Sequence, residues 1–164
     1  KRFVEKLGLQ FLPSIFLHGR LDKDPAPAEL RISPQQALAV DGNGRTPTDD
    51  CPLYPNADSP LPIDNIFRCA IGGGGGLYID PYGNVLPCSC IREPAGNALR
   101  EKIADVHEKA LAWARARIFT NNTQCQSCAI RSICYNCPGK AMLETGDLEG
   151  IVDWFCELAH LKRG

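Results

Sequence analysis

The sequence predicts a small α+β fold with one β-hairpin, flanking helices and long loops. Two short apolar runs, 77–80 and 84–88, flank Pro81-Tyr82-Gly83, which supplies turn dihedral angles and predicts the hairpin. Apolar residues recur at steps of three and four between 97 and 118, the period of an amphipathic helix. Eight prolines interrupt residues 20–68, which we expect to be poor in regular structure.

Composition limits the function classes. The chain has 164 residues, enough for one domain or a small domain with part of another, and its 44% hydrophobic content supports a packed core. The formal net charge of −1 does not indicate nucleic acid or an acidic membrane as a partner. No apolar run is long enough to span a bilayer and no signal peptide is visible, so we expect a cytoplasmic protein.

The first 68 residues predict the helix–strand step of an α/β unit, followed by a bridging segment. Residues 3–7 predict a helix end with Gly8 as its C-cap, and residues 9–12 predict a strand, together the helix–strand step of an α/β unit. In residues 20–68, Ser33-Pro34 with Gln36 predicts a helix start, and that helix runs to about Val40. His18 is expected to be structural rather than catalytic.

The remaining elements follow Cys69. The glycines of 72–76 predict a loop, and the hairpin, which Pro87 ends, delivers Cys88 and Cys90 to one place. The helix over 97–118 has Asn97 as a plausible N-cap and an apolar stripe of Leu99, Ile103, Val106, Ala110 and Trp113. Short helices are expected at 141–144 and 153–160, and the last carries Cys156 inward. His160, four residues later, is either a hydrogen-bond donor near a metal site or a plain helix-end histidine.

The cysteines point to a metal. Nine is an odd number, and four of the nine form two CxxC pairs, which favours metal-bound thiolates in a reducing compartment over disulfides. The run CQSCAIRSICYNCPGK is cramped for two zinc knuckles and is closer to bacterial ferredoxin runs, where the cysteine before proline ligates a second cluster. Cys125, Cys128 and Cys134 would then hold one iron–sulfur cluster and Cys137 another. The partners available for these clusters are Cys156, Cys51, Cys69, Cys88 and Cys90.

The full cysteine pattern resembles the SPASM domain, the C-terminal auxiliary-cluster domain of radical S-adenosylmethionine enzymes, many of which modify peptides or proteins. The pattern is Cys69-x13-Gly83-x4-Cys88, then the run that starts at Cys125, then Cys156, with IDPYGNVLPC and FCELAH as supporting phrases. The resemblance covers roughly 69–160. Residues 1–40 resemble, more weakly, the end of the radical SAM partial barrel and the bridge after it. The implied domains are a barrel tail (1–19), a bridging linker (20–68) and a small irregular iron–sulfur domain (69–164).

The resemblance implies two [4Fe–4S] clusters. Auxiliary cluster I would use Cys69, Cys88 and Cys137, and auxiliary cluster II would use Cys125, Cys128, Cys134 and Cys156. The fourth ligand of cluster I is left open between Cys51, Cys90 and an unliganded iron. The last pair is Cys-x2-Cys where the family often has Cys-x3-Cys. The clusters would transfer electrons or position a peptide or protein substrate, with a ferredoxin or flavodoxin as an electron donor.

The Cys-x3-Cys-x2-Cys motif that binds S-adenosylmethionine and the catalytic cluster in this family is not in the sequence. We therefore expect that both belong to an N-terminal half of a longer protein, and that this segment is not active alone. Two alternatives remain. A zinc-binding interaction module would use Cys125, Cys128, Cys134 and Cys137. A standalone ferredoxin-like electron carrier would keep the clusters without the barrel.

Overall fold

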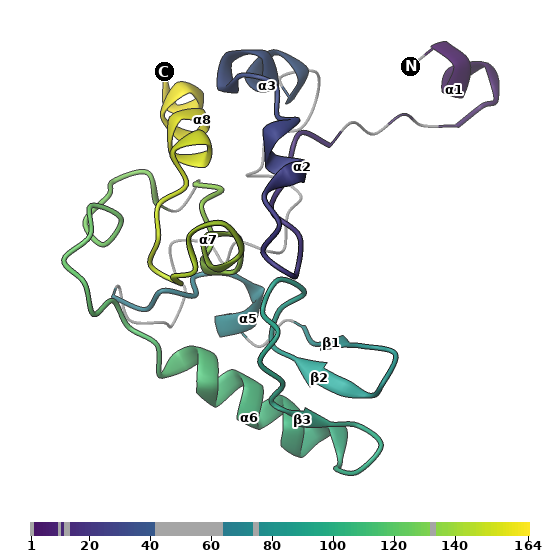
Figure 1. The fold of residues 1–164 in the computed structure, drawn as a ribbon, viewed down its shortest axis with the longest axis vertical. Helices are drawn as coiled ribbons and strands as arrows, with labels where there is room; N and C mark the ends of the chain where they lie inside the picture. The colour runs from purple at the N-terminus through teal and green to yellow at the C-terminus, as the bar shows by residue number, and fades with distance from the viewer. Residues whose placement is uncertain (1, 10, 12–13, 42–63, 74–75, 132–133) are drawn as a thin grey trace.

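The computed structural model describes residues 2–9, 11, 14–41, 64–73, 76–131 and 134–164 (Figure 1). The helices are α1 (Arg2–Lys6), α2 (Ala26–Glu29), α3 (Pro34–Asp41), α5 (Ala70–Gly73), α6 (Ile103–Arg115), α7 (Pro138–Thr145) and α8 (Asp153–Arg163). The strands are β1 (Tyr78–Ile79), β2 (Asn84–Leu86) and β3 (Gly96–Asn97), in one antiparallel sheet of order β1-β2-β3. This is the predicted α+β fold. None of the described helices is long and apolar enough to cross a bilayer.

The N-terminal segment contains the predicted helix, but the part of the predicted strand 9–12 that the structure describes is not a strand, and Gln10 and Leu12 lie outside the described residues. Gly8 has φ +70° and ends α1 with two backbone bonds, from Gly8 N to Glu5 O (3.0 Å) and from Leu9 N to Val4 O (3.2 Å). Leu9 and Phe11 are exposed and lie in no strand. No described strand pairs with them, and a strand without a partner leaves its backbone groups to water. Figure 1 shows α1 at the end of an extended segment, away from the other helices.

The bridge contributes to the core. At the start of α3, Ser33 Oγ accepts from Gln36 N (3.2 Å) and Gln36 Oε1 accepts from Ser33 N (3.0 Å), the reciprocal cap that the sequence predicts. Helix α3 packs beside α8 (Figure 1). The buried residues of this first core are Ile15, Ala37, Tyr135, Val152, Phe155 and Leu158. Residues of the expected bridge and of the expected iron–sulfur domain therefore share one core, and the domain boundaries stay a prediction.

The hairpin forms as predicted. Tyr78 pairs with Leu86 and Ile79 with Val85, and β2 ends before Pro87. Gly83 has φ +79° in the turn, where a Cβ atom would also lie 2.7 Å from Leu99 Cγ. Strand β3 was not predicted, because glycine and asparagine are depleted in strands and give no alternating pattern.

Helix α6 is shorter than predicted. It begins at Ile103, with Lys102 as the N-cap residue, and not at Asn97. Asn97 lies in β3 instead, where its side-chain amide donates to Tyr82 O and to Asn84 Oδ1, both at 3.1 Å. The buried residues of α6 are Val106, Ala110 and Ala114, whereas Leu99 is exposed.

A second core lies where α6 meets the segment before α5. Its buried members are Ile66, Phe67, Ile91 and Ala114, and Trp113 packs against them as the sequence predicts. Asn65 is fully buried, and its amide donates to the carbonyl oxygens of Ala114 (3.2 Å) and Arg115 (3.0 Å) at the end of α6. The prediction of a loop for 72–76 is wrong at its start, because Gly72 and Gly73 belong to α5. Arg115 Nε donates to Gly72 O (3.3 Å).

Candidate metal centres

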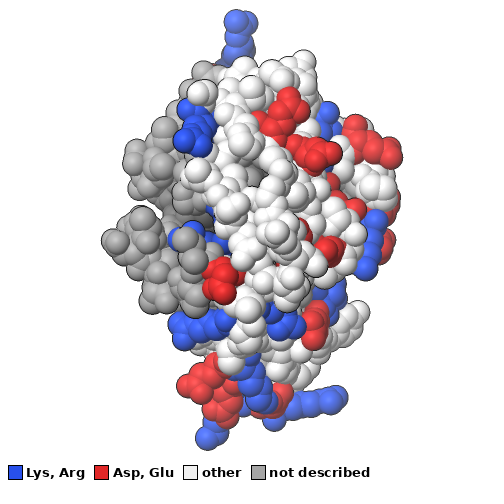
Figure 2. All heavy atoms as spheres, turned by 90° about the vertical axis from the view of Figure 1, so that its left-hand side faces the viewer, with Lys and Arg blue, Asp and Glu red and all other residues white. Residues whose placement is uncertain are grey.

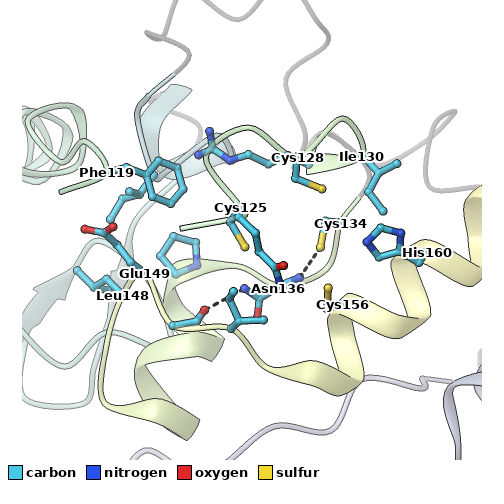
Figure 3. Close-up of a pocket in the computed structure, with 16 residues that line it drawn as sticks. Phe119, Cys125, Cys128, Ile130, Cys134, Asn136, Leu148, Glu149, Cys156 and His160 are labelled. Carbon is cyan, nitrogen blue, oxygen red and sulfur yellow. Dashed lines mark hydrogen bonds between the residues drawn. The ribbon is translucent and has the colours of Figure 1, made fainter. Parts of the chain in front are cut away.

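Four thiols line one pocket. Cys125, Cys128, Cys134 and Cys156 surround a cavity of about 210 Å³, and Figure 3 shows their sulfur atoms facing the same space. The first three come from the loop between α6 and α7, and Cys156 comes from α8. Much of the remaining lining is apolar, from Ile66, Phe119, Ile130, Pro138, Leu148 and Ile151. We call these four thiols group II.

The group II thiols influence one another. Burial raises the pKa of Cys134 to about 11, and burial followed by the neighbouring Cys156 and Cys128 raises the pKa of Cys125. Burial, and then Cys128, also raises the pKa of Cys156. The thiols of Cys125, Cys134 and Cys156 therefore favour their neutral form until a positive charge is present, and a bound metal supplies that charge and displaces the proton.

Asn136 ties Cys134 to the start of α8. Its backbone N–H donates to Cys134 Sγ (3.4 Å, dashed in Figure 3), its side-chain amide donates to Gly150 O (3.0 Å), and its Oδ1 accepts from Val152 N (3.1 Å). Val152 is the N-cap residue of the helix that carries Cys156. One residue thus links two members of group II, because its backbone contacts Cys134 and its side chain contacts the residues that lead into the helix of Cys156. Sequence analysis missed this residue, since a single asparagine between two cysteines carries no pattern.

Glu149 holds the loop before Cys125. Its Oε1 accepts from Thr120 N (2.9 Å) and Thr120 Oγ1 (2.6 Å), and its Oε2 accepts from Asn121 N (3.0 Å). Burial opposes ionisation of this carboxyl, but the hydrogen bonds from Thr120 and Asn121 lower its pKa on balance. The buried carboxylate is therefore a structural anchor at one edge of the pocket.

A second set of thiols, group I, consists of Cys69, Cys88 and Cys137. The Cys137 thiol interacts electrostatically with those of both Cys69 and Cys88. Burial raises the pKa of Cys69, and the hydrogen bond with Cys90 raises that of Cys88. Cys137 is the N-cap residue of α7, with Pro138 as the first helical residue. The two cysteines of the last CxxC pair therefore lie in different groups, Cys134 in group II and Cys137 in group I.

Cys90 lies against group I. It is buried, its backbone N–H donates to Cys88 Sγ (3.4 Å), and its thiol is hydrogen-bonded to that of Cys88. That hydrogen bond, with smaller contributions from His18 and Lys140, lowers the pKa of Cys90 to about 6 against the effect of burial. His18 Nδ1 also lies 2.8 Å from Gly19 O. Cys51, the other candidate, lies outside the described residues.

Gly139 lets α7 approach these thiols. A Cβ atom at this position would lie 2.9 Å from Cys90 Cβ and 3.1 Å from Cys88 Sγ, closer than ordinary contact allows. This glycine thus allows the start of α7 to pack directly on Cys88 and Cys90, which follow the β-hairpin.

The donor chemistry suits an iron–sulfur cluster. In the part of the chain that the structure describes, no three Cys, His, Asp or Glu side chains come close enough together to hold one metal ion. A cubane cluster binds each thiolate through a different iron, so its ligands stand farther apart than those of a single ion. Both groups offer soft thiol donors in partly buried surroundings, the type of donor that such clusters use.

Comparison with known families gives a match over part of the chain. Residues 69–129 match the family model SPASM, described as an iron-sulfur cluster-binding domain. The matched segment includes Cys69, Cys88, Cys90, Cys125 and Cys128. The remaining thiols of the two groups, Cys134, Cys137 and Cys156, lie beyond its end. No curated protein and no solved structure gives a match.

Proposed function

Because residues 69–129 carry a SPASM iron–sulfur cluster-binding domain, we propose that the chain binds two [4Fe–4S] clusters as the auxiliary domain of a radical SAM enzyme. The observation that carries the proposal is that Cys125, Cys128, Cys134 and Cys156 line one pocket, whereas Cys137, the partner of Cys134 in the last CxxC pair, is not part of that lining. A module for a single metal ion would use both cysteines of that pair together.

The four thiols of group II would hold cluster II. The three thiols of group I would hold cluster I, and we assign Cys90 as its fourth ligand because it is buried in contact with Cys88. Each thiol would lose its proton to solvent when it binds iron. Tyr135 and Asn136 are the only residues between Cys134 and Cys137, so one short stretch of backbone would join the two clusters.

When bound, such clusters supply one-electron transfer, or hold a substrate in place. The chain's own part is to fix the ligands through Asn136 and to exclude water with the apolar lining of the pocket. S-adenosylmethionine and a third cluster would be held by a separate N-terminal half. An electron donor such as a ferredoxin or flavodoxin and a reducing cytoplasm complete the proposal.

We propose a peptide or protein substrate rather than a nucleic acid. On the face that Figure 2 shows, the described acidic and basic side chains are interspersed around a broad uncharged band. This agrees with the formal net charge of −1. Nucleic-acid binding needs a concentrated basic surface to neutralise phosphates.

Serine variants in the two groups test the division. We expect Cys134→Ser to lose cluster II and keep cluster I, and Cys137→Ser to do the reverse, each retaining about four of about eight irons after anaerobic reconstitution. The measurement is iron and sulfide content with an electron paramagnetic resonance (EPR) spectrum of the reduced protein. The two variants should lose different signals.

Two further variants complete the series. Cys90→Ser should lose cluster I as Cys137→Ser does, whereas Cys51→Ser should match the parent chain; the opposite result moves the fourth ligand to Cys51. Under the zinc alternative, Cys134→Ser and Cys137→Ser would both abolish zinc binding and Cys156→Ser would not change it. That pattern would contradict the two-cluster proposal.

A further inference from the structure

The indole of Trp113 carries a buried hydrogen-bond donor without a described partner. Its Nε1 atom is inaccessible to solvent and makes no hydrogen bond to any described residue. Buried polar atoms in folded proteins are nearly always paired, because an unpaired buried donor costs about 1–3 kcal/mol. The hydrogen-bond acceptor for this buried indole N–H is therefore expected to be a bound group and not a protein atom.

The position of Trp113 suggests that partner. Trp113, Cys69 and Cys88 all pack against the same buried set of residues, the second core formed by Ile66, Phe67, Ile91 and Ala114. Two of the three group I thiols thus share a hydrophobic core with the unpaired donor. Among the described residues, the second buried polar atom without a hydrogen bond is Thr123 Oγ1, two residues before Cys125 of group II.

The indole ring is held in place on this core. Its centroid lies 5.3 Å from that of Phe67, which is fully buried, and the Arg117 guanidinium carbon lies 3.8 Å from the ring centroid. Arg117 Nη1 also donates to Trp113 O (3.3 Å). These contacts restrict the side-chain rotamers of Trp113, so the direction of its N–H is set before any cofactor binds.

We propose that the Trp113 indole N–H donates a hydrogen bond to a sulfur atom of cluster I and raises the reduction potential of that cluster. The inference rests on the proposed function. A hydrogen bond to a cluster sulfur stabilises the reduced form, which carries one more negative charge, and this is a recognised way in which a protein sets the potential. In this role Trp113 is a positioning and tuning residue, not a ligand.

The chain offers a matched control, because it has two tryptophans. Trp154 Nε1 donates to Ile32 O (2.8 Å), so its hydrogen bond is already made within the protein. We expect Trp113→Phe to keep the iron and sulfide content and to shift the cluster I potential to a lower value, measured by EPR-monitored redox titration. Trp154→Phe should leave that potential unchanged. The cluster I signal is identified as the one absent from Cys137→Ser.

A second measurement needs no change at Trp113. In Trp154→Phe with the remaining indole labelled with ¹⁵N, pulsed EPR of reduced cluster I should show a coupling to the indole nitrogen. An unchanged potential in Trp113→Phe, or no nitrogen coupling in the labelled protein, would overturn the proposal for Trp113 while the clusters stand. A chain that takes up no iron and sulfide would instead refute the proposed function itself.

Discussion

Arg31→Ala is expected to lower the free energy of unfolding by about 3–5 kcal/mol, the range for removing one partner of a buried ion pair. Arg31 and Glu144 form a bidentate pair, with Nη1–Oε2 at 2.9 Å and Nη2–Oε1 at 2.5 Å, and their side chains are only 8% and 11% exposed. The guanidinium also donates to Leu17 O (2.9 and 2.7 Å) and lies 4.7 Å from the Phe155 ring centroid. The substitution would therefore leave a buried carboxylate without its counter-ion.

The pair joins the bridge to α7 and α8, so its loss should loosen the packing of the helix that carries Cys156. Urea unfolding of the reconstituted chain, followed by circular dichroism, measures the effect. Arg20→Ala is the matched control, because Arg20 pairs with Asp24 at 3.0 Å with side chains 61% and 37% exposed, and such pairs contribute about 0–1 kcal/mol. Equal effects of the two substitutions would show that the Arg31 pair is not buried as described. Adding Glu144→Leu to Arg31→Met should restore part of the loss, since no unpaired charge remains.

Asn136→Ala is expected to cost about 2–4 kcal/mol of stability and to reduce the iron content of cluster II selectively. The substitution leaves Gly150 O and Val152 N without their partners, and the loss of each of these two partly buried hydrogen bonds costs about 1–2 kcal/mol, the lower part of the range for a buried group left unpaired. Because these bonds connect Cys134 to the start of α8, their loss frees Cys156 to move away from the other three thiols. Iron analysis and EPR of the reduced protein measure the selective loss.

Asn136→Asp tests the two side-chain hydrogen bonds of Asn136 separately. It keeps the acceptor for Val152 N and loses the donor to Gly150 O, so an intermediate iron content is expected. Asn122→Ala makes the same change as Asn136→Ala at an exposed position in the loop before Cys125 and should behave like the parent chain. If Asn136→Ala retained both clusters in full, Asn136 would not be the residue that positions Cys134 and Cys156.

The sequence predicted what depends on local chemistry. Pro81-Tyr82-Gly83 predicts a hairpin because proline and glycine restrict or permit particular dihedral angles. Ser33 with Gln36 predicts a helix start because both cap bonds lie within four residues. The cysteine run gives a further expectation through its likeness to ferredoxin runs, namely that Cys134 and Cys137 serve different clusters, and this stays a prediction.

The remaining features depend on contacts between distant segments. Asn97 has the residue type of an N-cap but lies in β3, because its side chain finds partners across the turn at Tyr82 and Asn84. Asn136 and Asn65 gain their roles only when other backbone segments reach them. Gly139 is informative only once the hairpin exit packs against α7. Residue propensities and spacing along the chain do not predict such contacts between distant segments.

The most direct test of the central claim is the metal and sulfide content of the chain after anaerobic expression and reconstitution, with a visible absorption spectrum. Two cubane clusters predict about eight iron and eight sulfide per chain, with broad visible absorption that bleaches on reduction. About one zinc per chain with no sulfide, as for a tetrahedral site of four thiolates, would contradict the account and make the domain a structural zinc module.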